Sequence, residues 1–569
     1  MKPKDLIEVS QSIADMLSAG LTSNGLVDPL EQRIVPHSYM TEHFAWQCSL
    51  LYSFTGENKW FDLALRSIEG SLLIEQGRFP DSIKSGTQYH WEFKNISLAF
   101  AFQIIGKELP PDLRTKLREA ILNWNNLNID STNWTAMRAV SYRLRYSLFG
   151  VTRDRWRSNL ELGLVLTKQT PDGFFPDTSK SYSFQYHVYT LALLSLLIQE
   201  FDIQQVLSRF LAGVDLIADF IDPDGDFNYF GRGQRQIFGY VSLIYALAVA
   251  SRVATREDDR ARYAELASRV FHFVSRNQPN GQWKLIVLND SEKDRLGWYD
   301  YNYSGDYLVF AGVYLLLAAK SLQGESIGTK KKGKFSSRCF KKYYPNLGLG
   351  IITTDTCFVV MSGISREPAE PLGLVHLWPN GETCFGGPGP NRTNLNYQRN
   401  YIGPLNKNGI PILSCIRGTL KRTNNGLVVR IPYENLEVKQ EIICSASSIV
   451  FKQTITAHSN SHYRCIIPLS VASSDAPECD IPLVVDGMAP AASGWKHVRR
   501  APELILIQKK SYHVSRLKWR CFDNFSNDDC NIEEKSTNAR LIFGAMFYRI
   551  VNRFLKLIWF LGVNWEKTR

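Results

Sequence analysis

Tyrosine, histidine, asparagine and arginine side chains, which can move protons and bind carboxylates, gather in short clusters along the first half of the chain. The most distinctive clusters are Gln185-Tyr-His187, with Tyr189 shortly after it, and Arg232-Gly-Gln-Arg235. Asn133 stands before a tryptophan in a third cluster. Asparagine or arginine can neutralise a carboxylate, and a tyrosine with cationic neighbours, which lower its pKa, can act as a base.

These residue types meet the three demands of β-elimination from a uronic acid. The carboxylate must be neutralised so that the adjacent C5 proton becomes acidic enough to remove. A base must then take that proton, and an acid must protonate the departing glycosidic oxygen. The candidate catalytic residues are Asn133, Tyr186, His187, Tyr189 and Arg232.

Other polar and aromatic residues of the same clusters are candidates for binding the substrate. Gly231 and Gly233 permit close backbone approach beside the arginines. In the second half, the segment from His376 through Phe385 to Arg392 is interpreted first as an ordinary connection between strands, with a loop that closes over the cleft as the alternative. The candidate binding residues are His90, Glu92, Trp134, Gln185, Gln234, Arg235, Tyr303, His376 and Trp378.

Two other functions compete with elimination. A glycoside hydrolase needs two carboxylates across a cleft, and acidic residues are available at Glu42, Glu92, Asp172, Asp177, Asp224, Asp226 and Asp306. A non-catalytic glycan-binding protein of capsule or exopolysaccharide production is the third reading. Elimination is favoured because the best clusters hold Tyr, His, Asn and Arg rather than paired acids.

The clusters recur at the start of successive apolar helices, at intervals of roughly 40 to 70 residues, which suits one helical hairpin each. Paired helices at this period form an inner and an outer ring, or else a solenoid. We expect an α/α toroid over residues 1–325, with the polar helix starts in one cavity. The six openings begin at Thr41, His90, Asn133, Gln185, Arg232 and Tyr301.

The pattern changes after a Gly- and Lys-rich linker at 326–340. Short, β-branched segments separated by Asn, Asp, Gly and Ser predict an antiparallel β-sandwich over 341–540. From 541 to 569 the chain reads as a basic amphipathic helix, apolar over 544–563 with a cationic stripe. Such a helix can pack against the protein or contact an anionic membrane. The fold class is therefore mixed: a helical toroid followed by a β-sandwich.

Composition agrees with a polyanionic partner. The formal net charge is +11, and aromatic residues make up 12% of the 569 positions. No zinc-finger spacing or RNP pattern accompanies this charge, so nucleic acid is not expected. No metal-ligand spacing is seen among the ten cysteines, so neither a metal nor a cofactor is predicted, and a structural calcium or zinc ion in the sandwich stays an open alternative. The first residues lack the features of a secretory signal, which points to a cytoplasmic protein, with membrane association through 544–563 as an option.

Asp172-Gly-Phe-Phe175 upstream of Gln185-Tyr-His-Val-Tyr189, together with the two-part architecture, resembles the polysaccharide lyases of the heparinase II/III, alginate lyase and hyaluronate/chondroitin lyase group. The resemblance implies a lyase in which Asn133 neutralises the uronate and Tyr186 or Tyr189 moves protons. His187 would be the partner of that tyrosine, and Arg232 would lower its pKa or bind the carboxylate. The longer Asn-aromatic signature of the hyaluronate group is missing.

Overall fold

The computed structural model describes most of residues 1–323 and strands between 340 and 520. The longer gaps are 76–90, 124–130, 279–282, 288–302, 324–339, 380–384, 387–400, 405–415 and 521–569. Shorter gaps are 36–37, 179–180, 355–356, 367–369, 434–435, 445–447 and several stretches between 458 and 511. His90, the predicted linker as far as residue 339, most of the loop from Phe385 to Arg392 and the C-terminal helix lie outside the described residues.

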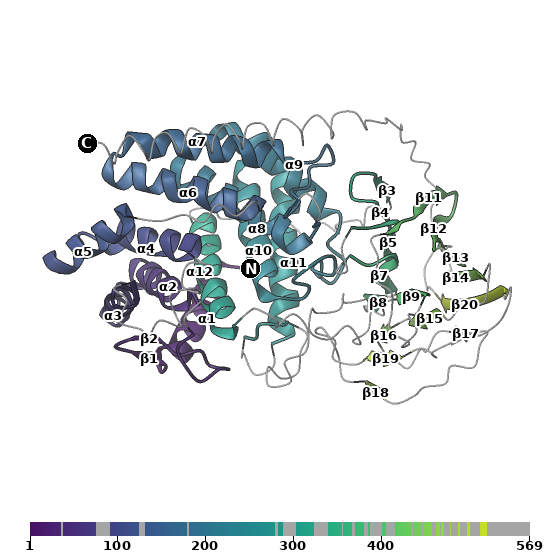
Figure 1. The fold of residues 1–569 in the computed structure, drawn as a ribbon, viewed down its shortest axis with the longest axis horizontal. Coiled ribbons are helices and arrows are strands. Elements are labelled where there is room, and N and C mark those ends of the chain that lie inside the picture. The colour runs from purple at the N-terminus through teal and green to yellow at the C-terminus, as the bar shows by residue number, and fades with distance from the viewer. Residues whose placement is uncertain are drawn as a thin grey trace.

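In the described part of the first half, six helices form an inner ring in which each packs against the next (Figure 1). They are α2 (Met40–Thr55), α4 (Trp91–Ile105), α6 (Thr132–Phe149), α8 (Phe184–Phe201), α10 (Ile237–Val253) and α12 (Ser304–Leu322). Helix α12 also packs against α2, so the ring is closed. Its members are buried on most of their faces because neighbouring helices cover them. The closed ring confirms the predicted toroid over the solenoid.

A second set of helices forms an outer layer, and each of them connects the end of one inner helix to the start of the next. This layer consists of α3 (Asn58–Glu75), α5 (Pro111–Leu122), α7 (Thr152–Thr167), α9 (Leu207–Ala218) and α11 (Glu257–Arg276), and α1 (Pro3–Ser18) covers α12. Each buries one stripe only, as in α11, where Tyr263, Ala267 and Val270 face inward. Because every return is an outer helix, all inner helices run the same way and begin at one end of the ring.

The small elements of the helical part are a hairpin, β1 (Leu21–Thr22) with β2 (Gly25–Leu26), and a 3-10 turn, η2 (Gln204–Val206). In the part of the chain that the structure describes, one helix, α12, is long and apolar enough to cross a membrane. Its apolar window is 94% buried, and it forms part of the inner ring. That burial is what a core helix of the toroid requires.

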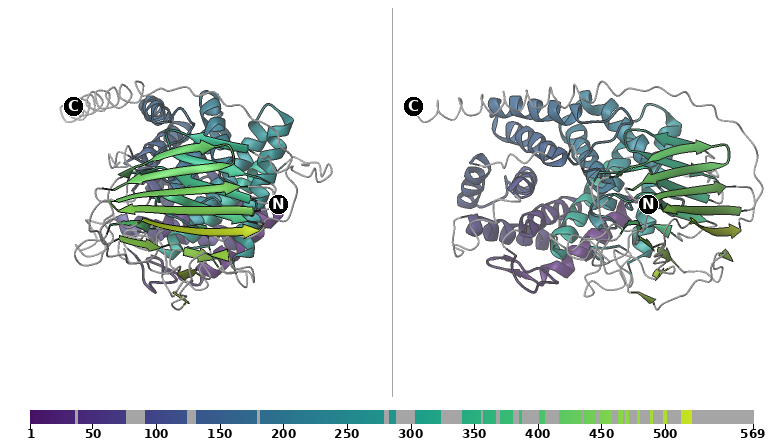
Figure 2. Two further views of the ribbon diagram at one scale, coloured as in Figure 1. Left: turned by 90° about the vertical axis from the view of Figure 1, so that its right-hand side faces the viewer. Right: turned by 45° about the vertical axis from the view of Figure 1, so that its right-hand side comes forward.

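All strand pairs described in the second half are antiparallel, as predicted (Figure 2). One sheet runs β3 (Phe340–Tyr344), β4 (Leu349–Thr353), β5 (Cys357–Ser362), β7 (Gly373–Pro379) and β8 (Phe385–Gly386). The other runs β11 (Thr419–Thr423), β12 (Gly426–Pro432), β13 (Leu436–Cys444), β14 (Ser448–Ala457), β20 (Tyr512–Arg520) and β17 (Glu478–Cys479).

Three smaller sheets complete the described strands. They are β6 (Ile364–Ser365) with β10 (Ile416–Arg417), β9 (Tyr401–Pro404) with β15 (Tyr463–Ile466), and β16 (Pro468–Ser470), β19 (Val498–Arg500) and β18 (Met488–Ala489). The two large sheets touch: a Cβ on Gly350 of β4 would lie 3.0 Å from Cδ2 of Leu420 in β11. Their complete pairing into a β-sandwich over 341–540 stays a prediction.

The five-stranded sheet contacts the end of the ring at which the inner helices begin. Asp219, just after α9, accepts bonds of 2.5 Å from the Lys342 amine and the Tyr344 hydroxyl, both in β3. The backbone N–H of Tyr182, just before α8, donates to the Glu370 carboxylate at 3.0 Å. These bonds connect the sheet to the loops that carry the predicted chemistry.

Candidate functional site

Three of the five predicted catalytic residues come together where α6, α8 and the turn before α10 meet. Arg232 pairs with the buried carboxylate of Asp177, and its guanidinium carbon lies 5.1 Å from the centre of the Tyr186 ring. Ser131 interacts with Asp177 and donates its hydroxyl hydrogen to Oδ1 of Asn133. We call Asn133, Ser131, Asp177, Tyr186 and Arg232 the front cluster.

The side-chain amide of Asn133 is held so that its N–H donors can bind a ligand. Asn133 is buried in the first turn of α6, and Ser131, the N-cap of that helix, occupies its oxygen. Its Nδ2 group has no hydrogen-bond partner among the described residues. Two N–H donors held in a buried setting are suited to bind a carboxylate, and the positive end of the α6 dipole lies beside them.

The loop after Phe175 is fixed to α6 and provides Asp177. The backbone N–H of Thr132 donates to the Asp177 carbonyl at 2.8 Å, and the Asp177 N–H donates to the Ser181 carbonyl at 3.0 Å. Burial raises the pKa of Asp177, while the Arg232 charge opposes that effect. Arg232 keeps 21% of its side chain exposed and Tyr186 is half-buried, so the groups suited to meet a ligand are the accessible ones.

Two glycines allow the arginine turn to approach α8, as predicted from the sequence. Gly231 and Gly233 have φ angles of 81° and 76°, in the region that side chains disfavour. A Cβ on Gly231 would overlap the Tyr182 carbonyl, and one on Gly233 would overlap the Gln185 amide. The Ser183 hydroxyl also donates to the Arg232 carbonyl at 2.6 Å. The turn is thereby held at the start of α8.

His187 is not placed to exchange a proton with Tyr186, contrary to the role that the resemblance implied. It is fully buried, and its Nδ1 accepts the backbone N–H of Phe175 at 3.0 Å. Its Nε2 lies 3.1 Å from the Gly213 carbonyl, to which it donates. Both ring nitrogens are therefore used to join the loop before α8 to helix α9.

The environment of His187 predicts a pH effect on stability. Burial lowers its pKa from 6.5 to about 3, so the folded protein excludes a proton that the unfolded chain binds between these values. The stabilisation by neutral His187 is complete above pH 6.5 and is lost as the pH falls, by about 1.4 kcal/mol per pH unit. In urea unfolding, a His187→Gln variant should lose part of the acid sensitivity of the wild type. The exposed His272→Gln variant is the control and should retain it.

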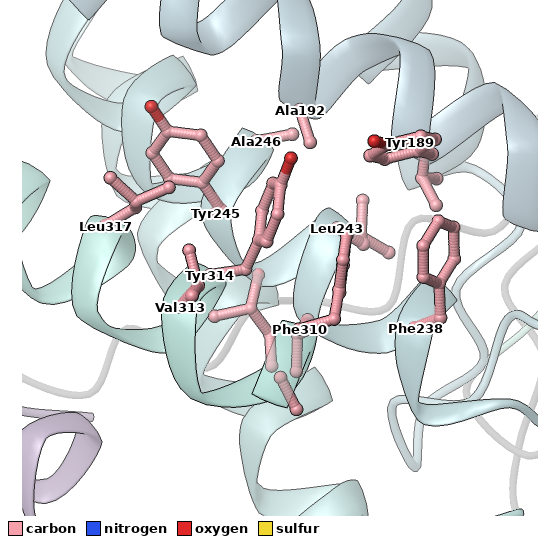
Figure 3. Packing of buried hydrophobic residues seen from close by; sticks show 14 of the residues in the cluster. Tyr189, Ala192, Phe238, Leu243, Tyr245, Ala246, Phe310, Val313, Tyr314 and Leu317 are labelled. Carbon is pink, nitrogen blue, oxygen red and sulfur yellow. The ribbon is translucent and has the colours of Figure 1, made fainter. Parts of the chain in front are cut away.

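Tyr189 lies in the core, where it packs among buried hydrophobic residues (Figure 3). Its ring packs against Phe238 at 4.6 Å and against Phe310 at 5.5 Å between centroids. Burial raises its pKa well above the ordinary value for tyrosine, which disfavours the phenolate form that a base requires. Of the two tyrosines predicted to move protons, the structure leaves Tyr186 in the accessible position.

Gln185, Gln234 and Arg235 are buried and support the turn from within. The Gln185 amide donates to Gln236 Oε1 at 2.5 Å, and Asn228 donates to Gln185 at 3.4 Å. Arg235, with a φ of 64°, forms a buried ion pair with Asp226. Gln185 and Arg235 thus use their polar groups within the fold, and the binding role predicted for these three residues stays a prediction.

His376 and Trp378 belong to strand β7 and not to a covering loop. His376 is buried, bonds to Oδ2 of Asp222 at 2.9 Å and stacks on Tyr229 at 4.1 Å. Trp378 is buried near the end of the same strand. These two residues therefore do not close over the cleft, because they pack against the turn between α9 and α10 and join the sheet to the toroid.

The same junction contains the described donor set that best resembles a metal site. Donor atoms of Asp222, Asp226 and His376, all buried, lie within 4.8 Å of one another. Two carboxylates and an imidazole can bind a divalent cation. Here Arg235 already places a positive charge on Asp226, and Asp222 Oδ1 accepts three backbone N–H groups. A metal would have to displace Arg235, so these residues fit an ion-pair network better.

The remaining predicted binding residues are spread around the ring opening. Glu92 is buried in α4, with a carboxylate oxygen 3.9 Å from the Arg138 guanidinium. Trp134 is buried in α6, and its ring stands at 85° to that of Phe93. Tyr303 is half-buried at the start of α12, on the opposite side of the ring from α6. Of these three residues, Trp134 adjoins the front cluster, because its backbone N–H donates to Oγ of Ser131 at 3.4 Å.

A second group of charges lies on α2, α4 and α12, across the opening from the front cluster. Glu42 and Lys94 are both buried, and Oε1 of Glu42 lies 3.7 Å from Nζ of Lys94. Asp306 Oδ1 accepts the Ser38 hydroxyl at 2.6 Å and the Tyr39 N–H at 2.9 Å. Burial raises the pKa of Asp306 to about 8, against the lowering effect of the Ser38 bond. Asp306 is thus a carboxyl that holds its proton near neutral pH.

Sequence reasoning missed Ser131 as part of the site and placed Asp177 only among candidate acids of a hydrolase. Ser131 has a local signal, since serine two residues before Asn133 at a helix start is a typical N-cap. Asp177 has none, because its partner Arg232 is far away in the chain and becomes a neighbour only when α8 is in place.

Comparisons with known proteins bear on the fold. No protein-family model and no curated protein sequence matched the chain. A Paenibacillus xanthan lyase structure is similar over 96% of this chain and 58% of its own, with 12% identity and a TM-score of 0.53. A family 88 glycosyl hydrolase from Bacteroides vulgatus (10% identity, 57% of this chain, 99% of its own) has a TM-score of 0.42. The chain thus has the fold of α/α-toroid enzymes and spans 58% of the length of the xanthan lyase.

Proposed function

We propose that the protein is a polysaccharide lyase that cleaves an acidic glycan at the front cluster. The observation that carries the proposal is the Nδ2 group of Asn133, which lacks a hydrogen-bond partner in the described part of the chain and lies in one cluster with Arg232 and Tyr186. Helices α6 and α8 both begin there, and their dipoles favour an anion. A uronic acid supplies that anion next to a removable proton. The proposal covers heparinase-like specificity as well as specificity for other acidic glycans.

In the proposed reaction, Asn133 and Arg232 bind the uronate carboxylate and stabilise the negative charge that develops on it. Tyr186, as a phenolate against the Arg232 guanidinium, removes the proton at C5. The electron pair left on C5 forms a double bond to C4, and the bond from C4 to the glycosidic oxygen breaks. The Tyr186 hydroxyl then returns its proton to that oxygen. One residue serves as base and acid in turn, because His187 is held elsewhere.

The charge and the fold support an anionic polymer as substrate. A net charge of +11 attracts polyanions over long range. The xanthan lyase with a similar fold is a polysaccharide-cleaving lyase by name, which fits the same class of reaction. The test is to incubate the protein with alginate, heparan sulfate, hyaluronan, chondroitin, xanthan and glucuronic-acid capsules. A rise in ultraviolet absorbance from the new conjugated double bond would support elimination, and new reducing ends without absorbance would contradict it.

Asp306 gives a second candidate function, a glycoside hydrolase. A carboxyl that stays protonated near neutral pH can donate to a leaving oxygen, and Asp177 on the far side of the opening offers a second carboxylate. If hydrolysis operates, Asp306→Asn should lower the formation of reducing ends by about 100-fold or more. If elimination operates at the front cluster, Asp306→Asn should change turnover little, provided that its melting temperature shows a folded protein. Specific binding without either product would favour the non-catalytic reading.

A further inference from the structure

Helix α7 lies in the outer layer (Figure 1), and it carries an exposed apolar strip that the proposed reaction does not use. Trp156 is 69% exposed, and Leu160, one turn further along, is 49% exposed. Residues four apart share a helix face, so the two side chains are neighbours on the outside of the ring. Among the described residues, the other large apolar side chains with such exposure are Met16 on α1 and Tyr343 on β3, which are isolated from this strip.

Arginines flank this strip. Arg155 is exposed and lies 5.7 Å from the Tyr146 ring of α6, and Arg157 is half-buried at 5.6 Å from the Tyr142 ring. The one acidic residue between 152 and 160, Asp154, is buried and pairs with Arg145 at 2.8 Å and with Arg157 at 3.8 Å, so two arginines share one carboxylate. The solvent-facing side of this turn of α7 therefore combines an exposed tryptophan and leucine with the positive charge of Arg155, which forms no ion pair with the described residues.

We propose that this α7 surface, Trp156 and Leu160 with Arg155 and Arg157, docks the protein on an anionic lipid membrane. Tryptophan is favoured at the membrane–water interface, and arginines are attracted to anionic headgroups. Leu160 favours a membrane over a polysaccharide as the partner. A sugar ring stacks on an aromatic face but gains little from contact with an aliphatic side chain. Two apolar residues support reversible contact only. The proposal does not depend on the reaction at the front cluster.

The test uses the full-length protein in co-sedimentation with vesicles of phosphatidylcholine, with or without phosphatidylserine. Binding should require phosphatidylserine and should weaken as salt is added, because the headgroup attraction is screened. Trp156→Ala should weaken binding by about tenfold, from the lost apolar burial. Arg155→Glu should weaken it by about tenfold or more, since it replaces attraction with repulsion.

Matched controls are Tyr343→Ala, an exposed aromatic on β3, and Arg256→Glu, an exposed arginine at the start of α11; neither should change vesicle binding. Equal vesicle binding by Trp156→Ala, Arg155→Glu and wild type would overturn the proposal. Equal binding combined with a melting temperature lowered by Trp156→Ala would show that another part of the chain covers the strip. Weaker binding of an acidic polysaccharide, with vesicle binding unchanged, would assign the surface to the polymer and would equally overturn the proposal.

Discussion

Tyr186→Phe is expected to lower the turnover of an acidic polysaccharide by about 10²–10⁴-fold, the usual contribution of a positioned acid or base. The ring and its contact with Arg232 are kept, and only the hydroxyl that moves the proton is lost. KM should therefore change little. The measurement is the initial rate of absorbance increase from the conjugated double bond, over a range of concentrations of the substrate found in the panel.

Two comparisons make this expectation specific. Tyr343→Phe removes a hydroxyl from an exposed position on β3 and should leave turnover unchanged. Tyr189→Phe removes a hydroxyl from the core and should have a much smaller effect than Tyr186→Phe. A large loss in Tyr189→Phe, with Tyr186→Phe active, would transfer the proton-moving role to Tyr189. If either variant is inactive because it has unfolded, its lowered melting temperature will show this.

Replacing Asn133 separates carboxylate binding from proton transfer at the same cluster. Asn133→Asp changes two N–H donors into a negative charge that would repel the uronate, whereas Tyr186→Phe leaves the carboxylate contacts in place. Asn133→Asp should lower turnover and also raise KM for the acidic polymer. The same substitution should weaken binding less for a substrate whose carboxylates are esterified. An effect equal for both substrates would contradict the assigned role.

Arg235→Met is expected to lower the free energy of unfolding by about 3–5 kcal/mol, the cost of leaving a buried charge without its partner. Asp226 would remain buried, with the Tyr240 hydroxyl and the Asn228 N–H as its described hydrogen-bond donors. Asp226 would become protonated or take in water, and either change would disturb the turn that holds Arg232. The measurement is urea unfolding at neutral pH, with stability compared to that of wild type.

The control for this loss is Arg256→Met, at an arginine whose ion pairs are exposed to solvent. Exposed pairs contribute about 0–1 kcal/mol, so that variant should be nearly as stable as wild type. Adding Asp226→Leu to Arg235→Met should recover much of the stability, because no buried charge is then left unpaired. Unchanged stability of Arg235→Met together with weaker glycan binding would instead support the binding role predicted from the sequence.

Much of the fold followed from local patterns. Apolar residues at helical spacing predicted the inner and outer helices, and the polar openings predicted that one end of the ring would be distinct. Both predictions are confirmed. The spacing of apolar residues indicates which face of a helix is covered by neighbours, and because outer helices return the chain, the inner helices all run in one direction. The antiparallel pairing of the strands followed in the same way from their short lengths and turn residues.

The sequence alone therefore determined the toroid, the antiparallel strands and the end of the ring where the candidate chemistry lies. Only the tertiary structure decided which residues are accessible there. His187 is buried with both ring nitrogens bonded, and Tyr189 lies in the core. Arg235 forms an ion pair with Asp226. Asn133, Tyr186 and Arg232, in contrast, come together through contacts with Ser131 and Asp177. The physical reason is that burial and partner choice depend on contacts between distant segments, which residue type and local spacing do not encode.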